Sequence, residues 1–194
     1  MKTKVYRNTD GQWYVDTYKN NEIKSTRKTR RWEKPEYIRM YTEGPCSQIQ
    51  AYLRSGINKY NPALNFGLSI NTVINGIDRE LENRLGDPAP KFVYRMDNGE
   101  LLSHMDENVI VDKGYTSTTV DTHIFSGKFS VLYKIEGLAW DAGSMVDDLS
   151  QYNEAEYLFR RGSQFKVIES NSEYYLEHIR KTVRLVRLQY TGRV

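Results

Sequence analysis

Apolar residues recur at helical spacing in the first half of the chain and at strand spacing in the second half. The clearest helix is predicted over residues 70–85, where one face carries Ile70, Val73, Ile74, Ile77, Leu81 and Leu85. Gly86, Pro88 and Pro90 follow it as stop signals. A shorter helix is predicted from about Tyr41, with Pro45 in its first turn and Ile49, Tyr52 and Leu53 at spacing three and four.

Beyond Pro90 the pattern becomes that of strands. Runs of β-branched and aromatic residues predict strands at residues 91–95, 114–119, 129–135, 164–168 and 182–190. Helices first and strands afterwards indicate an α+β fold rather than alternating βαβ units, so we expect the helices to cover one side of a sheet.

The N-terminal residues have a different character. Residues 4–18 predict a β-hairpin with its turn at Asp10 and Gly11. Residues 24–31 are polar and lack apolar periodicity, so we expect a loop or linker. This basic run has two interpretations, a patch that binds nucleic acid or a partner, and a solvated connection.

The charge of the chain is unevenly distributed. The 194 residues carry a net charge of +3. Residues 1–40 hold 11 Lys and Arg against 5 Asp and Glu, a balance of +6, so the rest hold 17 against 20, a balance of −3. The basic character therefore belongs to the first fifth of the chain, and we expect an acidic body behind a basic extension.

Composition limits the class of protein. A mean hydropathy of −0.70 and 27% charged residues are typical of a soluble domain, and the 39% hydrophobic content suffices for one core. No stretch approaches the ~20 apolar residues of a membrane span, and no signal peptide follows Met1. A single cysteine, Cys46, excludes an internal disulfide. We expect a protein that acts in a cytoplasm, that of a host or target cell.

Common catalytic motifs are absent, and one short motif stands out. There is no phosphate-binding glycine loop, no dinucleotide-binding Gly-x-Gly-x-x-Gly and no nucleophile elbow. The three histidines are scattered in sequence, so we predict no metal site. Glu154 and Glu156 stand where a loop enters a strand, and on an extended backbone they would share one face. Alone, this pair is also typical of a charged surface strand.

Two upstream elements strengthen the interpretation. Arg95 ends a predicted strand, and Ser117-Thr118-Thr119 lies in a hydroxyl-rich one. With Glu154 and Glu156 after them, the sequence resembles the mono-ADP-ribosyltransferases of the Arg-Ser-Glu class. That class includes arginine-directed bacterial toxins, vertebrate ecto-enzymes, phage transferases and Rho-directed clostridial exoenzymes.

The resemblance implies a role for each motif residue. Arg95 would bind the phosphates of NAD, since a guanidinium binds phosphate oxygens bidentately. Ser117 would orient Glu156, the catalytic glutamate. A glutamate at the position of Glu154 goes with arginine acceptors in relatives, so the resemblance implies arginine specificity. Thr119 replaces the last serine of the Ser-Thr-Ser motif and keeps the hydroxyl.

Further NAD contacts are implied around these residues. The resemblance assigns cofactor-binding positions to Thr118, to Phe125 against the nicotinamide, to Lys128 near a phosphate and to Asn75 on the helix before the arginine strand. It implies a mixed, two-sheet β core around an NAD cleft, with N-terminal helices packed on it. NAD would be consumed as a co-substrate without a metal, and the partner would be a protein with an accessible arginine.

The resemblance covers roughly residues 41–190. We therefore divide the chain into a basic extension, residues 1–40, and a catalytic domain, residues 41–194. Three alternatives stay open: an NAD glycohydrolase on the same fold, a non-catalytic module that binds nucleic acid or a partner through Arg27, Lys28, Arg30 and Arg31, and, remotely, a two-carboxylate glycosidase.

Overall fold

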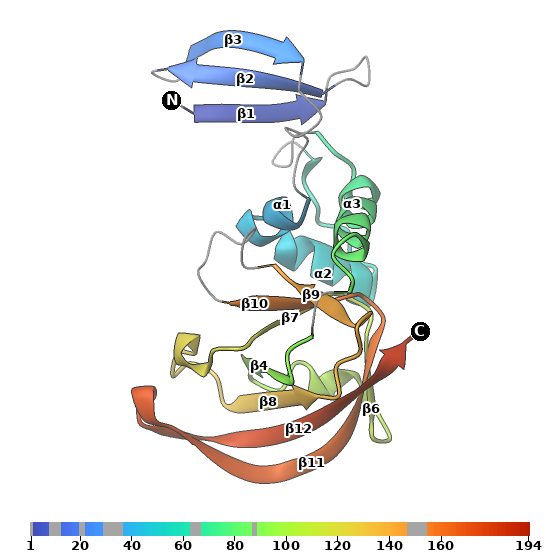
Figure 1. Ribbon diagram of the computed structural model, residues 1–194, viewed down its shortest axis with the longest axis vertical. Helices are drawn as coiled ribbons and strands as arrows, with labels where there is room; N and C mark the ends of the chain where they lie inside the picture. The colour runs from blue at the N-terminus through green and yellow to red at the C-terminus, as the bar shows by residue number, and fades with distance from the viewer. Residues whose placement is uncertain are drawn as a thin grey trace.

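The structure is a computed structural model of the chain. It describes residues 2–7, 13–19, 22–28, 37–62, 67–86, 89–146 and 155–194. These residues form a three-stranded sheet, three α-helices and a nine-stranded sheet, arranged along the long axis of the molecule (Figure 1). None of the helices in these ranges is both long and apolar enough to cross a membrane.

The N-terminal sheet contains one strand more than the pattern predicted. β1 (Lys2–Arg7), β2 (Trp13–Lys19) and β3 (Glu22–Lys28) pair antiparallel in sequence order. The predicted loop at residues 24–31 is therefore wrong over residues 24–28, which belong to β3. The pattern did not predict this strand because residues 24–28 lack apolar periodicity. The strand pairs with β2 through backbone hydrogen bonds, which are independent of side-chain type. Residues 29–31 lie outside the described part of the chain.

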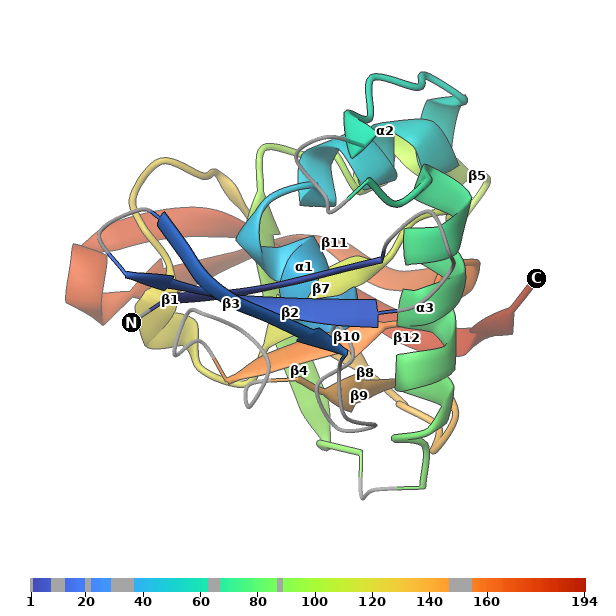
Figure 2. The ribbon, with the colours of Figure 1, turned by 90° about the horizontal axis from the view of Figure 1, so that it is seen from above.

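Three helices cover one side of the larger sheet (Figures 1 and 2). They are α1 (Tyr37–Glu43), α2 (Cys46–Ser55) and α3 (Ile70–Glu82). α3 begins at an N-cap, Ser69, whose hydroxyl accepts a hydrogen bond from the Thr72 N–H at 3.2 Å. It ends three residues before the predicted Leu85, because residues 83–86 continue as a turn.

Close packing joins α1 to α3. The ring of Tyr37 lies over Gly76, where an added Cβ would come within 2.2 Å of the ring. The Glu80 carboxylate accepts hydrogen bonds from the first two backbone N–H groups of α1, those of Tyr37 and Ile38, at 2.8 Å each.

The predicted domain boundary between residues 40 and 41 falls inside α1, and the division into two domains stays a prediction.

The larger sheet has the strand order β5-β6-β11-β12-β8-β4-β7-β10-β9. Its strands are β4 (Phe92–Asp97), β5 (Met105–Asp106), β6 (Val109–Asp112), β7 (Thr116–Thr119), β8 (Val131–Glu136), β9 (Gly143–Met145), β10 (Glu156–Phe159), β11 (Ser163–Leu176) and β12 (Lys181–Arg193). β8 and β12 pair parallel, and the other pairs among these strands are antiparallel. The 3₁₀ turns are η3 (Leu102–His104), η4 (Thr122–Ile124) and η5 (Glu177–Ile179).

One pairing divides this sheet into two parts. β4 and β7 share only the pair Tyr94↔Thr119, whereas β4 and β8 share six pairs. The strands from β5 to β4 thus form one layer, and β7, β10 and β9 form another, as Figure 1 shows. A buried aromatic cluster fills the space between them, with Tyr157 and Phe159 of β10 packed near Phe165 and Tyr190. The predicted α+β fold with a mixed, two-part β core is confirmed.

Candidate active site

A pocket lies where β4 and β7 separate. Its volume is about 240 Å³, and it is lined by Tyr94, Arg95, Met96, Ser117, Thr118, Thr119, Ile124, Phe125, Ser126 and Phe129. Four of the predicted site residues are among them: Arg95, Ser117, Thr118 and Phe125. The fold therefore brings together residues from three segments that are up to 30 positions apart in sequence.

A short hydrogen bond joins two of the predicted catalytic residues. The Ser117 hydroxyl donates to Glu156 Oε1 at 2.6 Å. Antiparallel pairing of β7 with β10 sets Glu156 opposite Thr119 and Leu158 opposite Ser117, so Ser117 and Glu156 are diagonal neighbours on one face. Glu156 is 5% exposed, so little solvent competes for its carboxylate. Thr118 points to the other face, where its hydroxyl donates to the Tyr157 carbonyl at 2.6 Å.

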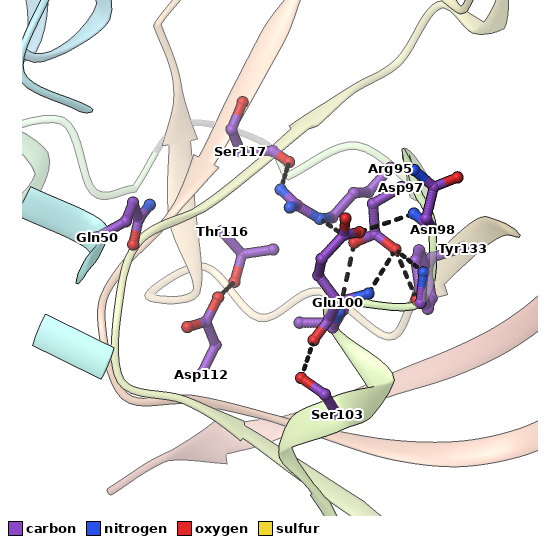
Figure 3. A network of polar contacts seen from close by, with 12 residues as sticks. Gln50, Arg95, Asp97, Asn98, Glu100, Ser103, Asp112, Thr116, Ser117 and Tyr133 are labelled. Atoms are coloured by element: carbon purple, nitrogen blue, oxygen red, sulfur yellow. Dashed lines mark hydrogen bonds and ion pairs between the residues drawn. The ribbon is translucent and has the colours of Figure 1, made fainter. Parts of the chain in front are cut away.

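Arg95 spans the gap between the two layers. Its Nη1 donates to the Ser117 carbonyl at 3.2 Å, and its Nε donates to Asp97 Oδ2 at 3.1 Å (Figure 3). Nη2 makes no hydrogen bond to any residue that the structure describes, and the side chain is 21% exposed. The guanidinium is thus fixed on two sides and keeps donors for an anionic ligand.

Asp97 holds Arg95 and was not predicted from the sequence. Its carboxylate is buried, and Oδ1 accepts hydrogen bonds from the Gly99 N–H at 2.7 Å, the Glu100 N–H at 3.1 Å and the Tyr133 hydroxyl at 2.9 Å. Burial alone would raise the pKa of Asp97, but the Arg95 guanidinium and these donors outweigh it and lower the pKa. The signal was present in the sequence, since Arg95 and Asp97 are two residues apart on one strand and share a face.

A second buried carboxylate supports the strand that carries Ser117. Asp112 accepts two hydrogen bonds from Arg54 of α2, at 2.8 and 2.7 Å, one from the Thr116 hydroxyl at 2.7 Å and one from the Gly114 N–H at 2.9 Å. Burial would raise the pKa of Asp112, and the Arg54 guanidinium reverses this and lowers it. The pair therefore anchors the start of β7 to a helix.

Glu154, the predicted acceptor-binding residue, lies outside the described residues. Ala155 has φ +45°, in the left-handed region, and β10 begins only at Glu156. The expectation of an extended backbone from residue 154 to residue 156 is therefore wrong at Ala155, because a left-handed residue changes the direction of the chain there. The rule that places side chains two apart on one face does not apply across this residue.

The remaining predicted contacts lie outside the pocket lining. Lys128 is exposed in the turn before β8, and Asn75 is exposed on α3 beside the buried Ile74. Both stay predictions. At the N-terminus of α2, partial burial is the largest cause that raises the pKa of the Cys46 thiol, and the negative charge of the Glu156 carboxylate raises it further.

Two of the three histidines, scattered in sequence, meet in space. The ring centroids of His123 and His178 are 5.3 Å apart, and His123 Nδ1 lies 2.9 Å from Asp121 Oδ1. Across the described ranges, no group of three or more His, Cys, Asp or Glu residues could hold a metal ion. His104 lines a larger pocket of about 610 Å³ with Arg54, and that pocket contains none of the predicted site residues.

Comparisons with known proteins identify the family of the chain. Residues 10–186 match the model of a family described as ADP-ribosyltransferase exoenzyme. No curated protein matches the chain.

Three solved structures illustrate the similarity in fold. Plx2a, an ADP-ribosyltransferase toxin from Paenibacillus larvae, has a TM-score of 0.58 and 19% identity over 82% of this chain and 87% of its own. The ADP-ribosylating toxin BECa of C. perfringens, solved with NADH, has a TM-score of 0.63 and 20% identity over 80% of this chain and 42% of its own. The C3 exoenzyme of Clostridium limosum has a TM-score of 0.59 and 14% identity over 80% of this chain and 83% of its own.

Proposed function

Because the chain belongs to the ADP-ribosyltransferase exoenzyme family, we propose that it transfers ADP-ribose from NAD to an arginine side chain of a protein and releases nicotinamide. The family membership confirms the predicted enzyme family and NAD as its co-substrate. The acceptor and the role of each residue are our proposal. They rest on the resemblance of the motifs and on the geometry of the site.

The observation that carries the proposal is the Ser117–Glu156 hydrogen bond beside Arg95. Cleavage of the nicotinamide–ribose bond develops positive charge on the ribose, as in glycoside hydrolysis. A buried carboxylate held in place by a hydroxyl can stabilise that charge, because it does not need to reorganise when the charge appears. We assign this role to Glu156, and the role of holding its carboxylate to Ser117.

Arg95 is suited to the pyrophosphate of NAD. Its Nε and Nη1 are fixed by Asp97 and Ser117, while its Nη2 and its partial exposure leave donors for phosphate oxygens. Phe125, half-buried in the pocket lining, offers an aromatic face for the nicotinamide ring. The pocket thus provides a cation for the pyrophosphate and an aromatic ring for the nicotinamide.

Arginine is the proposed acceptor because Glu154 precedes Glu156 by two positions. An arginine guanidinium has a pKa above ~12 and is a poor nucleophile while it is protonated. A carboxylate can bind it, direct one nitrogen to the ribose carbon and accept its proton. We assign this role to Glu154.

The test is incubation of the protein with labelled NAD and a cell lysate, followed by mass spectrometry of the labelled proteins. We expect ADP-ribose on arginine side chains. Glu156→Gln should lower nicotinamide release about 100-fold or more. Glu154→Ala should lose transfer and retain some NAD hydrolysis. Glu173→Gln, which removes an exposed glutamate from β11, is the matched control and should retain full activity.

Each contrary result has a distinct meaning. Label on a different side chain would refute the arginine acceptor, and equal residual transfer in the two site variants would refute the division of roles. Hydrolysis without any labelled protein would favour the NAD glycohydrolase. The proposal assigns no role in NAD cleavage to the basic extension. Loss of NAD cleavage on replacing Arg27, Lys28, Arg30 and Arg31 would contradict this.

A further inference from the structure

One wall of the pocket is a segment without regular backbone pairing. Residues 122–129, the cleft-wall segment, join β7 to β8 and contribute Ile124, Phe125, Ser126 and Phe129 to the pocket lining. Only residues 122–124, as η4, form regular structure in it. Its backbone carbonyls from residue 125 onward are therefore not committed to a helix or a strand, and their hydrogen bonds come from elsewhere.

Two side chains at the start of β12 and in η5 bind these carbonyls. Lys181 Nζ donates to the Gly127 carbonyl and to the Phe129 carbonyl, at 2.8 Å each. His178 Nε2 lies 3.0 Å from the Phe125 carbonyl, the position of a hydrogen-bond donor. Three alternate carbonyls of the cleft-wall segment are thus held by two residues that lie more than 50 positions further along the chain.

Apolar packing supports the same contact. The tip of the β11–β12 hairpin lies beside the cleft-wall segment in both ribbon views (Figures 1 and 2). Phe125, Phe129 and Ile179 all pack against one buried cluster, formed by Met96, Leu132, Leu176 and Val183. The His178 ring contacts the His123 ring of η4 at a centroid distance of 5.3 Å. The tip therefore contacts the wall through hydrogen bonds, apolar packing and a tilted contact between two histidine rings.

We propose that the tip of the β11–β12 hairpin, through Lys181 and His178, positions the cleft-wall segment so that Phe125 meets the nicotinamide end of NAD. Lys181 acts here as a positioning residue, since it binds the backbone of the wall and does not line the pocket. The kinetic consequence rests on the proposed function, whereas the contact between hairpin and wall does not. A wall held in its bound shape lowers the ordering cost of binding and thus favours a low KM for NAD.

Lys181→Met tests this role, because methionine replaces the apolar stem of lysine with one of similar length and lacks the ammonium group. We expect KM for NAD to rise roughly threefold to tenfold with kcat little changed, since the wall contacts the substrate before and during bond cleavage. Lys181→Arg should restore much of the loss, because a guanidinium also donates to two carbonyls. Lys166→Met makes the same change at an exposed position of the same hairpin and should leave KM unaltered.

A second measurement does not depend on turnover. Amide hydrogen exchange in residues 122–130, followed by mass spectrometry, should be faster in Lys181→Met than in the wild type or in Lys166→Met. An NAD titration of the same exchange, carried out in the Glu156→Gln background where cleavage is removed, should require several-fold more NAD when Lys181 is also replaced.

The outcomes separate this inference from the proposed function. Unchanged exchange in Lys181→Met would overturn the inference, and so would faster exchange with unchanged KM and unchanged NAD titration, which would reduce Lys181 to a structural tie. A wild-type protein that cleaves no NAD would refute the proposed function. The exchange titration would still support the inference if NAD protects the wall, and would overturn it if NAD does not.

Discussion

Replacing Asp97 by Asn tests whether this buried carboxylate fixes Arg95. Asp97 is 4% exposed, its Oδ2 accepts from Arg95 Nε at 3.1 Å, and its Oδ1 accepts from two backbone N–H groups and the Tyr133 hydroxyl. An asparagine side chain has one acceptor oxygen and one donor NH₂ group. In either orientation, the NH₂ group therefore faces either Arg95 Nε or the donors that now bind Oδ1. The guanidinium also loses the neutralising charge beside it.

The cost can be estimated from these contacts. Breaking a fully buried charge pair costs about 3–5 kcal/mol of unfolding free energy, and hydrogen bonds to charged groups contribute about 1.5–3 kcal/mol. The Arg95 side chain is 21% exposed, so solvent screens part of the pair, and we expect a loss of about 2–3 kcal/mol. For a chain of this length that corresponds to a melting temperature lower by roughly 4–12 °C.

The pH dependence gives a sharper signature. The Asp97 pKa is below its ordinary value of 3.8, so the folded protein binds this proton less readily than the unfolded chain does. The resulting stability is complete above the unfolded pKa and is lost as pH falls through the folded pKa. Asp97→Asn should therefore reduce stability by a constant amount above about pH 5, and the gap to the wild type should narrow below about pH 4.

Urea denaturation at pH 7 and at several values between pH 3 and pH 5 measures both effects, and NAD kinetics at pH 7 measures the effect on the site. Tyr133→Phe is the matched control, because it removes one donor to Asp97 and leaves the charge pair, at a cost of about 1 kcal/mol. Equal stability of Asp97→Asn and the wild type at pH 7, together with an unchanged KM for NAD, would refute the reasoning.

Three other changes have expected outcomes. Asp112→Asn should destabilise the protein by about 2–4 kcal/mol in urea denaturation, because the buried carboxylate has a bidentate guanidinium partner that solvent screens in part; a loss below 1 kcal/mol would contradict this. Gly76→Ala should cost about 1–3 kcal/mol, measured in the same way, because the new methyl group overlaps the Tyr37 ring; a neutral effect would mean that the ring can move aside. Glu156→Gln should speed iodoacetamide alkylation of Cys46, the single cysteine, near pH 8, because loss of the carboxylate lowers the thiol pKa and raises the thiolate fraction. An unchanged rate would show that the Glu156 charge does not raise the thiol pKa.

The local pattern of the sequence predicted much of the fold. The helix at residues 70–82 and the long strands are visible because each buries one regular face against the core. β9 was missed because Gly143, Ser144 and Met145 carry no strand signature, and Gly143 is required by close approach of the Leu158 carbonyl, 2.2 Å from where a Cβ would be. β3 was missed because pairing with β2, rather than side-chain pattern, defines it.

The sequence motifs predicted which residues of the candidate site come together, and they did not predict the residues that support them. The register of β7 and β10 brings Ser117 and Glu156 within hydrogen-bond distance, and Arg95 of β4 reaches the Ser117 carbonyl. Asp112 could not be found by motif, because its partner Arg54 comes from another element, whereas Asp97 lies on the strand of Arg95 and only the spacing of two residues indicated their contact. A contact between Lys181 and the carbonyls of another loop leaves no trace in local sequence, since any residue supplies a carbonyl.

The single pairing of Tyr94 with Thr119 has a mechanical consequence. Few backbone hydrogen bonds join the two layers at that line, and Arg95 supplies an additional link through the Ser117 carbonyl. In the proposed function, NAD binds Arg95 on one layer and the Ser117–Glu156 pair on the other, and would therefore link the two layers. Under this proposal, NAD would stabilise the folded protein where β4 and β7 share their single backbone pair, because a ligand that binds only the folded state opposes unfolding.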